Sequence, residues 1–188
     1  SGSGKSTVAR CVMRLIDPGQ GRVTLAGTDI THLKPGAMRR HRAKIQIVFQ
    51  DPYRSLNPRR RIADSLIEGP MNFGRTRDQA LARARDLLET VGLTADALDR
   101  YPHQFSGGQR QRIAIARAVA MEPEVIVADE AVSALDVSVQ DQVLKLLERL
   151  QDELGIAILF ITHDLRVAAQ ICDEVIVMQQ GRVVEQGP

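Results

Sequence analysis

Short apolar runs alternate with longer stretches of helical spacing along most of the chain. The runs at 45–49, 125–128 and 157–162 are apolar at nearly every position, which is typical of strands buried on both faces. Apolar residues that recur every three or four positions predict helices over 62–69, 76–91, 109–120 and 137–153. Because such strands need a helical layer on each side, the pattern predicts an α/β fold with a mostly parallel sheet and helices on both faces.

Turn residues delimit the remaining predicted elements. A first helix should run from Lys5 to the turn at 17–19, and a strand over 21–25 should end in a turn over 27–29. The other predicted elements are a short helix over 35–42, proline-containing loops over 51–58 and 101–105, a helix over 164–171, and a hairpin of strands 174–178 and 182–185. The hairpin turn is centred on Gln180 and Gly181.

The stretch from 51 to 122 contains predicted helices and no predicted strand. This change of pattern predicts a helical subdomain inserted into the α/β core. The 188 residues are enough for one domain with a sizeable core, so we interpret residues 1–188 as a single domain.

Composition limits the possible partners. The net charge is only +2, so bulk charge does not indicate a nucleic-acid partner. The short basic clusters at 39–42 and 59–61 fit a solvated surface better than an RNA or lipid patch. No apolar run approaches the ~20 residues of a membrane helix. Cys11 and Cys172 match no metal or redox spacing and are interpreted as reduced residues of a cytosolic protein.

The N-terminus carries the latter part of the phosphate-binding pattern G-x-x-x-x-G-K-[S/T]. It consists of Ser1, Gly2, Ser3, Gly4, Lys5, Ser6 and Thr7. The glycines let backbone N–H groups crowd around a phosphate, and the following helix points its positive end at the same oxygens. Lys5 is expected to reach the β- and γ-phosphates and Ser6 to bind Mg²⁺. The alternative, a flexible linker before a helix, explains the apolar helix after Lys5 less well.

Polar side chains follow three of the predicted strands. Asp129 and Glu130 end one strand, Gln50 another and His163 a third. The carboxyl ends of parallel strands are where ligands bind in such folds. We expect Asp129 to hold Mg²⁺ and Glu130 to orient an attacking water, with Gln50 and His163 near a γ-phosphate. Surface turns or helix caps remain the alternative for each residue taken alone.

A second phosphate-binding candidate lies before the helix over 109–120. It consists of Ser106, Gly107, Gly108 and Gln109. Ser106 is suited to cap that helix, and the glycines leave N–H groups open to a ligand. Because the first loop already occupies one side of a triphosphate, we hypothesise that a second copy of the domain supplies this motif head-to-tail. Residues 133–136 would then lie at the interface. A simple N-cap is the alternative.

Taken in order, these motifs resemble those of the ATP-binding cassette (ABC) ATPases, which are P-loop NTPases. They correspond to the Walker A, Q-loop, signature, Walker B, D-loop and switch-histidine motifs. The resemblance covers essentially the whole chain and implies ATP and Mg²⁺ as ligands. It implies catalytic roles for Gln50, Glu130 and His163. It also implies nucleotide contacts from 1–7 and 106–109, and Mg²⁺ contacts from Ser6, Gln50 and Asp129.

Residues 49–58, 105–112 and 132–140 are similar to the ATPase subunits of dipeptide, oligopeptide, glutathione and nickel importers. That narrower resemblance implies a place on the cytoplasmic face of a bacterial inner membrane. It also implies two integral-membrane permease subunits as partners, with a periplasmic binding protein contributing indirectly. Residues of about 50–70 would face the permease.

The sequence departs from the family pattern in two respects. Ala131 stands where the family usually has proline, although Glu130 is intact. The resemblance also implies strands before Ser1, with an aromatic residue that stacks on adenine, and an extension after Pro188. We therefore expect the chain to be truncated at both ends, and residues 1–188 alone to bind ATP poorly.

Two other functions stay open at this point. The chain could serve a non-transport complex, such as phosphonate-degradation machinery or a nucleic-acid factor, although the neutral charge balance disfavours nucleic acid. It could also be a regulatory module that binds ATP without hydrolysing it, although Glu130 and His163 argue against that.

Overall fold

A three-stranded parallel sheet forms the centre of the molecule in this computed structural model, which describes residues 2–188. The strands are β3 (Ile45–Phe49), β4 (Val125–Asp129) and β5 (Ala157–Ile161), in the order β3-β4-β5. All three coincide closely with the apolar runs of the sequence. The parallel pairing confirms the predicted α/β class.

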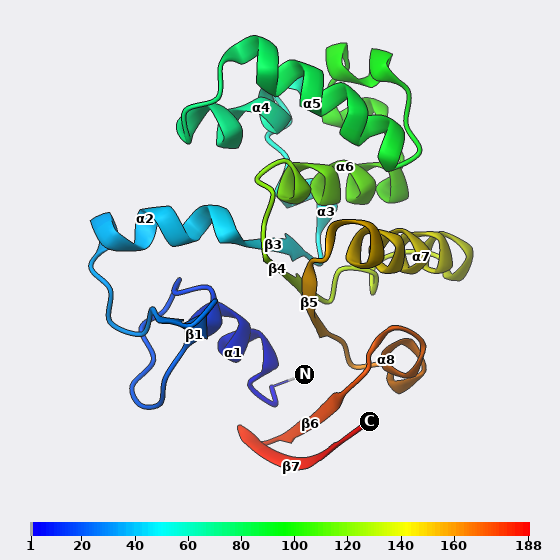
Figure 1. Cartoon of the computed structure of the whole chain (residues 1–188). Coiled ribbons are helices and arrows are strands. Elements are labelled where there is room, and N and C mark those ends of the chain that lie inside the picture. Colours follow the sequence, from blue (N-terminus) through cyan, green and yellow to red (C-terminus); the bar gives the residue numbers. More distant parts are fainter. Residues whose placement is uncertain (1) are drawn as a thin grey trace.

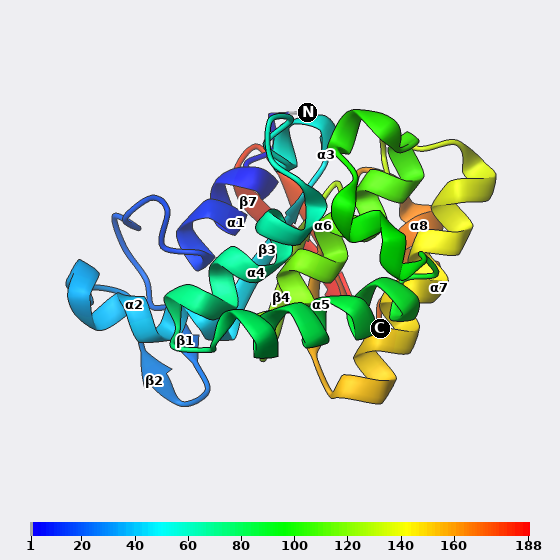
Figure 2. The ribbon, with the colours of Figure 1, turned by 90° about the horizontal axis from the view of Figure 1, so that it is seen from above.

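Helices cover both faces of this sheet at β4, whereas Ala157 and Leu159 on one face of β5 are exposed, so the expected burial of that strand on both faces is wrong. On one face Ile126 and Ala128 of β4 pack in a buried cluster with α6 (Gly107–Val119) and α7 (Val137–Leu154). On the other face Val127 packs against Ala9 of α1 (Lys5–Val12). Figures 1 and 2 show α1 on one side of the strands and α6 and α7 on the other. Because consecutive β4 side chains point to opposite faces, all three are buried, which is why the strand lacks an apolar–polar alternation.

The stretch 51–122 contains helices only, as the sequence predicts. These are α3 (Pro52–Ser55), α4 (Ile62–Asn72), α5 (Arg77–Thr90), two 3₁₀ turns (Ala95–Asp99 and Pro102–Gln104) and α6. In Figure 1, α4 and α5 lie beyond α6 as seen from the sheet. One buried cluster joins α4 and α5 to α6 and the sheet, so the packing is continuous. The division of the chain at 51 and 122 stays a prediction.

The first part of the chain differs from the prediction. Helix α1 ends at Val12 rather than near Asp17, because Arg14 takes a left-handed conformation with φ 52°. The expected strand 21–25 is reduced to β1 (Thr24–Leu25). It pairs antiparallel with β2 (Thr28–Asp29), where a turn had been predicted. The turn lies at Ala26 and Gly27, which both have positive φ angles, as a type I′ two-residue hairpin turn requires.

The expected loop over 51–58 also contains the short helix α3. The Asp51 carboxylate accepts hydrogen bonds from the backbone N–H groups of Tyr53 and Arg54, and Pro52 occupies the first helical position. The predicted loop before Ser106 likewise contains a 3₁₀ turn. In both places a proline that indicates a loop starts a helical turn instead.

The other elements lie where the sequence predicts them, with shifted ends. Helix α2 spans Pro35–Lys44 and α8 spans Leu165–Ile171, while β6 (Val175–Gln179) and β7 (Arg182–Gly187) form the expected antiparallel hairpin. Within residues 2–188, no helix combines the length and apolar composition that crossing a membrane requires.

Candidate functional site

The parallel register aligns the carboxyl ends of the three central strands. Phe49 of β3 pairs with Asp129 of β4, which pairs with Ile161 of β5. The polar residues that follow these positions therefore emerge at one edge of the sheet. Gln50 follows β3 directly, and His163 lies two residues after β5.

The N-terminal loop meets this edge through Ser6. Its hydroxyl donates a hydrogen bond to Asp129 Oδ1 at 3.0 Å, joining the first turn of α1 to the end of β4. A serine hydroxyl beside a carboxylate is a fitting pair of hard oxygen ligands for Mg²⁺. In the described part of the chain, no group of three or more His, Cys, Asp and Glu could hold a metal ion. Any Mg²⁺ at Ser6 and Asp129 would therefore need further oxygens from phosphate and water, which is how Mg²⁺ is usually bound.

The loop itself has the backbone that close approach to a phosphate needs. Gly2 and Gly4 both have φ 91°, a conformation that is strained for residues with a side chain. Lys5 Nζ donates to Ser3 Oγ at 3.0 Å, so its ammonium group lies back over the loop. Ser1 belongs to the same motif but lies outside the described residues. The first turn of α1 thus presents its N–H groups beside a lysine.

The β6–β7 hairpin supports this loop, which the sequence did not reveal. The backbone N–H of Gly181 donates to the carbonyl of Ser3 at 3.0 Å. A side chain at Gly4 would lie 3.5 Å from Gly181 Cα. The turn at Gln180 and Gly181 is visible in the sequence, but its contact with residues at the opposite end of the chain depends on the tertiary fold.

Glu130 and His163 lie close together beyond the carboxyl ends of β4 and β5. Glu130 Oε2 lies 3.6 Å from His163 Nδ1, too far for a strong direct hydrogen bond. Glu130 has a positive φ of 51°, and its backbone N–H donates to the carbonyl of Ile161 at 2.9 Å. A non-glycine residue in this conformation is costly and persists only where its surroundings fix it. The structure thus places the carboxylate and the imidazole close together, where a water could contact both.

Asp164 fixes the chain just after His163. Its carboxylate accepts from the backbone N–H of Arg166 at 2.9 Å, which caps α8, and it also pairs with the Arg166 guanidinium. These hydrogen bonds hold the pKa of Asp164 below its ordinary value of 3.8. The cap is therefore charged at neutral pH and limits the freedom of the loop that carries His163.

Ser106 caps α6, as the sequence predicts. Gln109 N–H donates to Ser106 Oγ at 3.3 Å, and Ser106 N–H donates to Gln109 Oε1 at 3.0 Å, which completes a capping box. Within residues 2–188, no hydrogen bond or ion pair joins residues 106–109 to the N-terminal loop.

Gly108 has a second role that sequence reasoning missed. A Cβ atom added there would lie 2.3 Å from Val139 Cγ1 on α7, so the glycine permits close packing of two helices. At Gly107 the nearest atom, Leu135 Cδ2, would be 3.9 Å away. The motif therefore packs closely against the start of α7 through Gly108.

Gln50 is exposed and makes no hydrogen bond within residues 2–188. The residue before it is held from α6, because Gln111 Nε2 donates to the carbonyl of Phe49 at 3.2 Å. Gln111 is completely buried, and sequence reasoning did not single it out. Only its place in the motif over 105–112 could have drawn attention to it.

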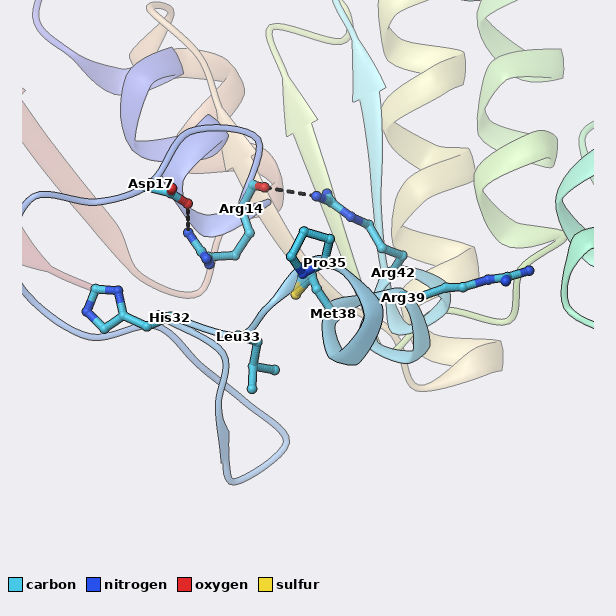
Figure 3. Close-up of a pocket in the computed structure, with 8 residues that line it drawn as sticks. All are labelled: Arg14, Asp17, His32, Leu33, Pro35, Met38, Arg39 and Arg42. Atoms are coloured by element: carbon cyan, nitrogen blue, oxygen red, sulfur yellow. Dashed lines mark hydrogen bonds and ion pairs between the residues drawn. The ribbon is translucent and has the colours of Figure 1, made fainter.

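A cavity of about 540 Å³ lies away from these residues, beyond the C-terminal end of α1 (Figure 3). It is lined by Arg14, Asp17, His32, Leu33, Pro35, Met38, Arg39 and Arg42. The Arg42 guanidinium donates to the carbonyls of Met13 and Arg14, and Arg14 bonds Asp17 and the carbonyl of Ile30. These arginines bind the protein's own acceptors, and no predicted site residue lines the cavity.

Comparison with known proteins decides the family. The family model described as ABC transporter matches residues 1–133. The chain belongs to the ABC transporter family. This confirms the resemblance inferred from the ordered motifs.

Several curated relatives of this ABC chain carry import names. A putative peptide import ATP-binding protein of Brucella ovis is 53% identical over 186 residues, which cover 98% of this chain and 59% of the relative. A probable peptide ABC transporter ATP-binding protein of Sinorhizobium fredii is 54% identical, covering 100% and 54%. A glutathione import ATP-binding protein of Escherichia coli O157:H7 is 52% identical, covering 100% and 30%. The chain therefore spans little more than half the length of the two peptide-import relatives and 30% of the length of the glutathione-import relative.

Solved structures confirm the ABC ATPase fold. A Clostridium perfringens protein described as part of an ABC transporter complex superposes with a TM-score of 0.90 at 34% identity, covering 100% of this chain and 73% of that one. An ATP-binding cassette in a dimeric post-hydrolysis state with ADP and Pi gives a TM-score of 0.84 at 31% identity, covering 98% and 80%.

Proposed function

We propose that this ABC chain binds and hydrolyses ATP to power uptake of peptides, or of a related small solute such as glutathione, through a membrane importer. The observation that carries the proposal is the hydrogen bond of Ser6 to Asp129, with Glu130 and His163 3.6 Å apart at the same sheet edge. The import names of the relatives favour transport over a non-transport complex.

The N-terminal loop binds the phosphates. The backbone N–H groups of 2–7 and the Lys5 ammonium replace the hydration of the β- and γ-phosphates. Ser6, Asp129 and Gln50 would hold Mg²⁺, directly or through water. When bound there, the ion would supply positive charge beside the phosphate oxygens.

Glu130 and His163 act on the attacking water. The Glu130 carboxylate accepts a hydrogen bond from that water and orients it toward the γ-phosphorus. His163 contacts the water or a γ-phosphate oxygen from the neighbouring strand. The left-handed backbone of Glu130 is the kind of strain that occurs at functional positions.

A second cassette completes the site from the other side of the nucleotide. Ser106 to Gln109 of one chain contact the γ-phosphate held by the partner's loop, with 133–136 at the interface. The dimeric cassette with ADP and Pi among the solved structures supports this arrangement. ATP then joins two cassettes, and hydrolysis removes the bridging phosphate so that they separate.

The permease partner contacts residues of about 50–70, at the cytoplasmic face of the membrane. Phe49 and Tyr53 have 40% and 64% of their surface exposed, an unusual amount for aromatic side chains. Apolar side chains that are exposed beside Gln50 are suited to a partner that must influence hydrolysis. A periplasmic binding protein would deliver the solute to the permease.

The test uses the full-length protein. Glu130→Gln should abolish ATP turnover while ATP-dependent dimerisation is preserved, because the amide keeps the size of the side chain but loses the base. Glu89→Gln, at an exposed position on α5, is the matched control and should hydrolyse normally. Undiminished turnover of the Glu130→Gln variant would refute the role of Glu130.

A further inference from the structure

Helix α6 holds the two ends of the segment that follows Gln50. At one end, Gln111 Nε2 donates to the carbonyl of Phe49 at 3.2 Å. At the other end, an Arg117 guanidinium nitrogen donates to the carbonyl of Ser55. We call residues 50–54, between these two anchored carbonyls, the strap.

A third side chain of α6 contacts the strap between its ends. The Arg110 guanidinium carbon lies 3.9 Å from the centre of the Tyr53 ring, a cation–π geometry. The same guanidinium donates through Nε to the carbonyl of Pro102 at 2.7 Å, in the turn that leads to Ser106. Arg110 therefore joins the middle of the strap to the chain immediately before the cap of α6.

Of the anchoring side chains, Gln111 is buried and Arg117 is half-buried, whereas Gln50, Tyr53 and Arg54 of the strap are exposed. Gln111 is fully buried, and burial lowers the pKa of Arg117, opposed by the carboxylate of Glu68. Above the helix, the side chain of Arg54 is 91% exposed. Contacts thus come from α6 on one side, and the opposite side of the strap is free for another molecule.

The cost of these buried polar groups indicates what they are for. Gln111 Oε1 is buried without a hydrogen-bond partner in the described part of the chain, which is unfavourable. An apolar residue of the same shape would avoid that cost but could not donate to Phe49. The half-buried guanidinium of Arg117 also loses part of its hydration, which carries a cost. Both side chains make a hydrogen bond to the backbone of the segment 49–55, which an apolar replacement would lose.

We propose that Gln111 and Arg117 are positioning residues that anchor the two ends of the strap, with Arg110 as a third contact. When a membrane partner displaces the strap, Gln50 and the Ser106 end of α6 then move together, and the strap does not bend by itself. This inference rests on the proposed function for its partner, but the anchoring itself can be tested separately.

The first measurement concerns the anchor and needs no partner. In a cysteine-free background of the full-length protein, spin labels are placed at Arg54→Cys and Glu89→Cys, both exposed, and their distance distribution is measured. Adding Gln111→Met or Arg117→Met should broaden that distribution, whereas the matched exposed change Arg85→Met should not. If both anchor variants keep the original width, the anchoring is refuted. Should Arg117→Met fail to fold, Gln111→Met still decides the question.

The second measurement concerns coupling, with the protein reconstituted with its permease in lipid nanodiscs. Gln111→Met should reduce permease-stimulated ATP turnover by about tenfold, equivalent to about 1.4 kcal/mol of coupling free energy, with an unchanged KM for ATP. Arg117→Lys, which keeps a donor and the charge, should retain more stimulation than Arg117→Met. A broadened distribution with full stimulation would overturn the coupling. If the unsubstituted protein shows no ATP turnover, the proposed function is wrong. The distance measurement still tests the anchoring by Gln111 and Arg117 in that case.

Discussion

The close contact between Gly108 and Val139 gives a prediction that distinguishes packing from ligand binding. In Gly108→Ala, the new Cβ would lie 2.3 Å from Val139 Cγ1, 3.6 Å from Val139 Cβ and 3.8 Å from Val139 Cγ2. Carbon atoms normally rest about 3.5–4.0 Å apart, so the first contact is too short by more than ~1 Å. Either α6 must move away from α7 by about that amount, or Val139 must leave its rotamer, which is strongly preferred in a helix.

The expected cost follows from this overlap. Overpacking of this kind typically destabilises a protein by about 1–3 kcal/mol. A displacement of about 1 Å at the start of α6 would also move Ser106, and misplacement on that scale reduces catalytic rates by roughly a hundredfold. Gly108→Ala should therefore lower both the midpoint of thermal unfolding and the ATP turnover of the full-length protein.

A second substitution tests the cause. Val139→Ala removes both γ-carbons, so the double variant Gly108→Ala/Val139→Ala should recover most of the lost stability and turnover. Gly36→Ala is the matched control, because a Cβ added there meets no atom within 4 Å, and it should behave like the parent. If the double variant stays as inactive as Gly108→Ala, glycine is required at 108 for a reason other than Val139, and the packing argument is wrong.

Three further predictions concern the sheet edge and its surroundings. Ser6→Ala should weaken ATP binding in the presence of Mg²⁺ far more than in EDTA, because it removes the oxygen beside Asp129. If calorimetric titrations show the same loss of ATP affinity in both conditions, Ser6 has no role in metal binding. Gly4→Ala should weaken nucleotide binding in either condition and lower the unfolding midpoint by the equivalent of about 1–2 kcal/mol, because φ 91° is strained for alanine; an unchanged midpoint would contradict the strain. Asp164 has a lowered pKa, so its cap on α8 contributes stability above its ordinary pKa of 3.8 and loses that contribution as pH falls through the lowered value. The loss of unfolding free energy caused by Asp164→Ala should therefore be smaller in strong acid than at neutral pH when both are measured by denaturant unfolding. A loss that does not change with pH would exclude the charged cap.

Much of the fold was predictable because its signals are local. The strands over 45–49, 125–129 and 157–161 are apolar at nearly every position, and this pattern indicates a parallel sheet. Burial on both faces holds for the central strand but not for 157–161, where Ala157 and Leu159 are exposed. The capping box of Ser106 and Gln109 depends on residues three positions apart, so it too could be predicted. Errors occurred where a single backbone angle decides the element. Arg14 ends α1 early by taking a positive φ, a conformation that an arginine side chain does not indicate.

The sequence by itself determined the family, the class of fold and the polar residues that end each central strand, because motif spacing and hydrophobic period are encoded over a few residues. The tertiary structure decided which distant groups meet: Gly181 with Ser3, Gly108 with Val139, and Gln111 with Phe49. These contacts depend on how whole helices and the hairpin pack, and packing geometry is a property of the assembled core rather than of any short segment.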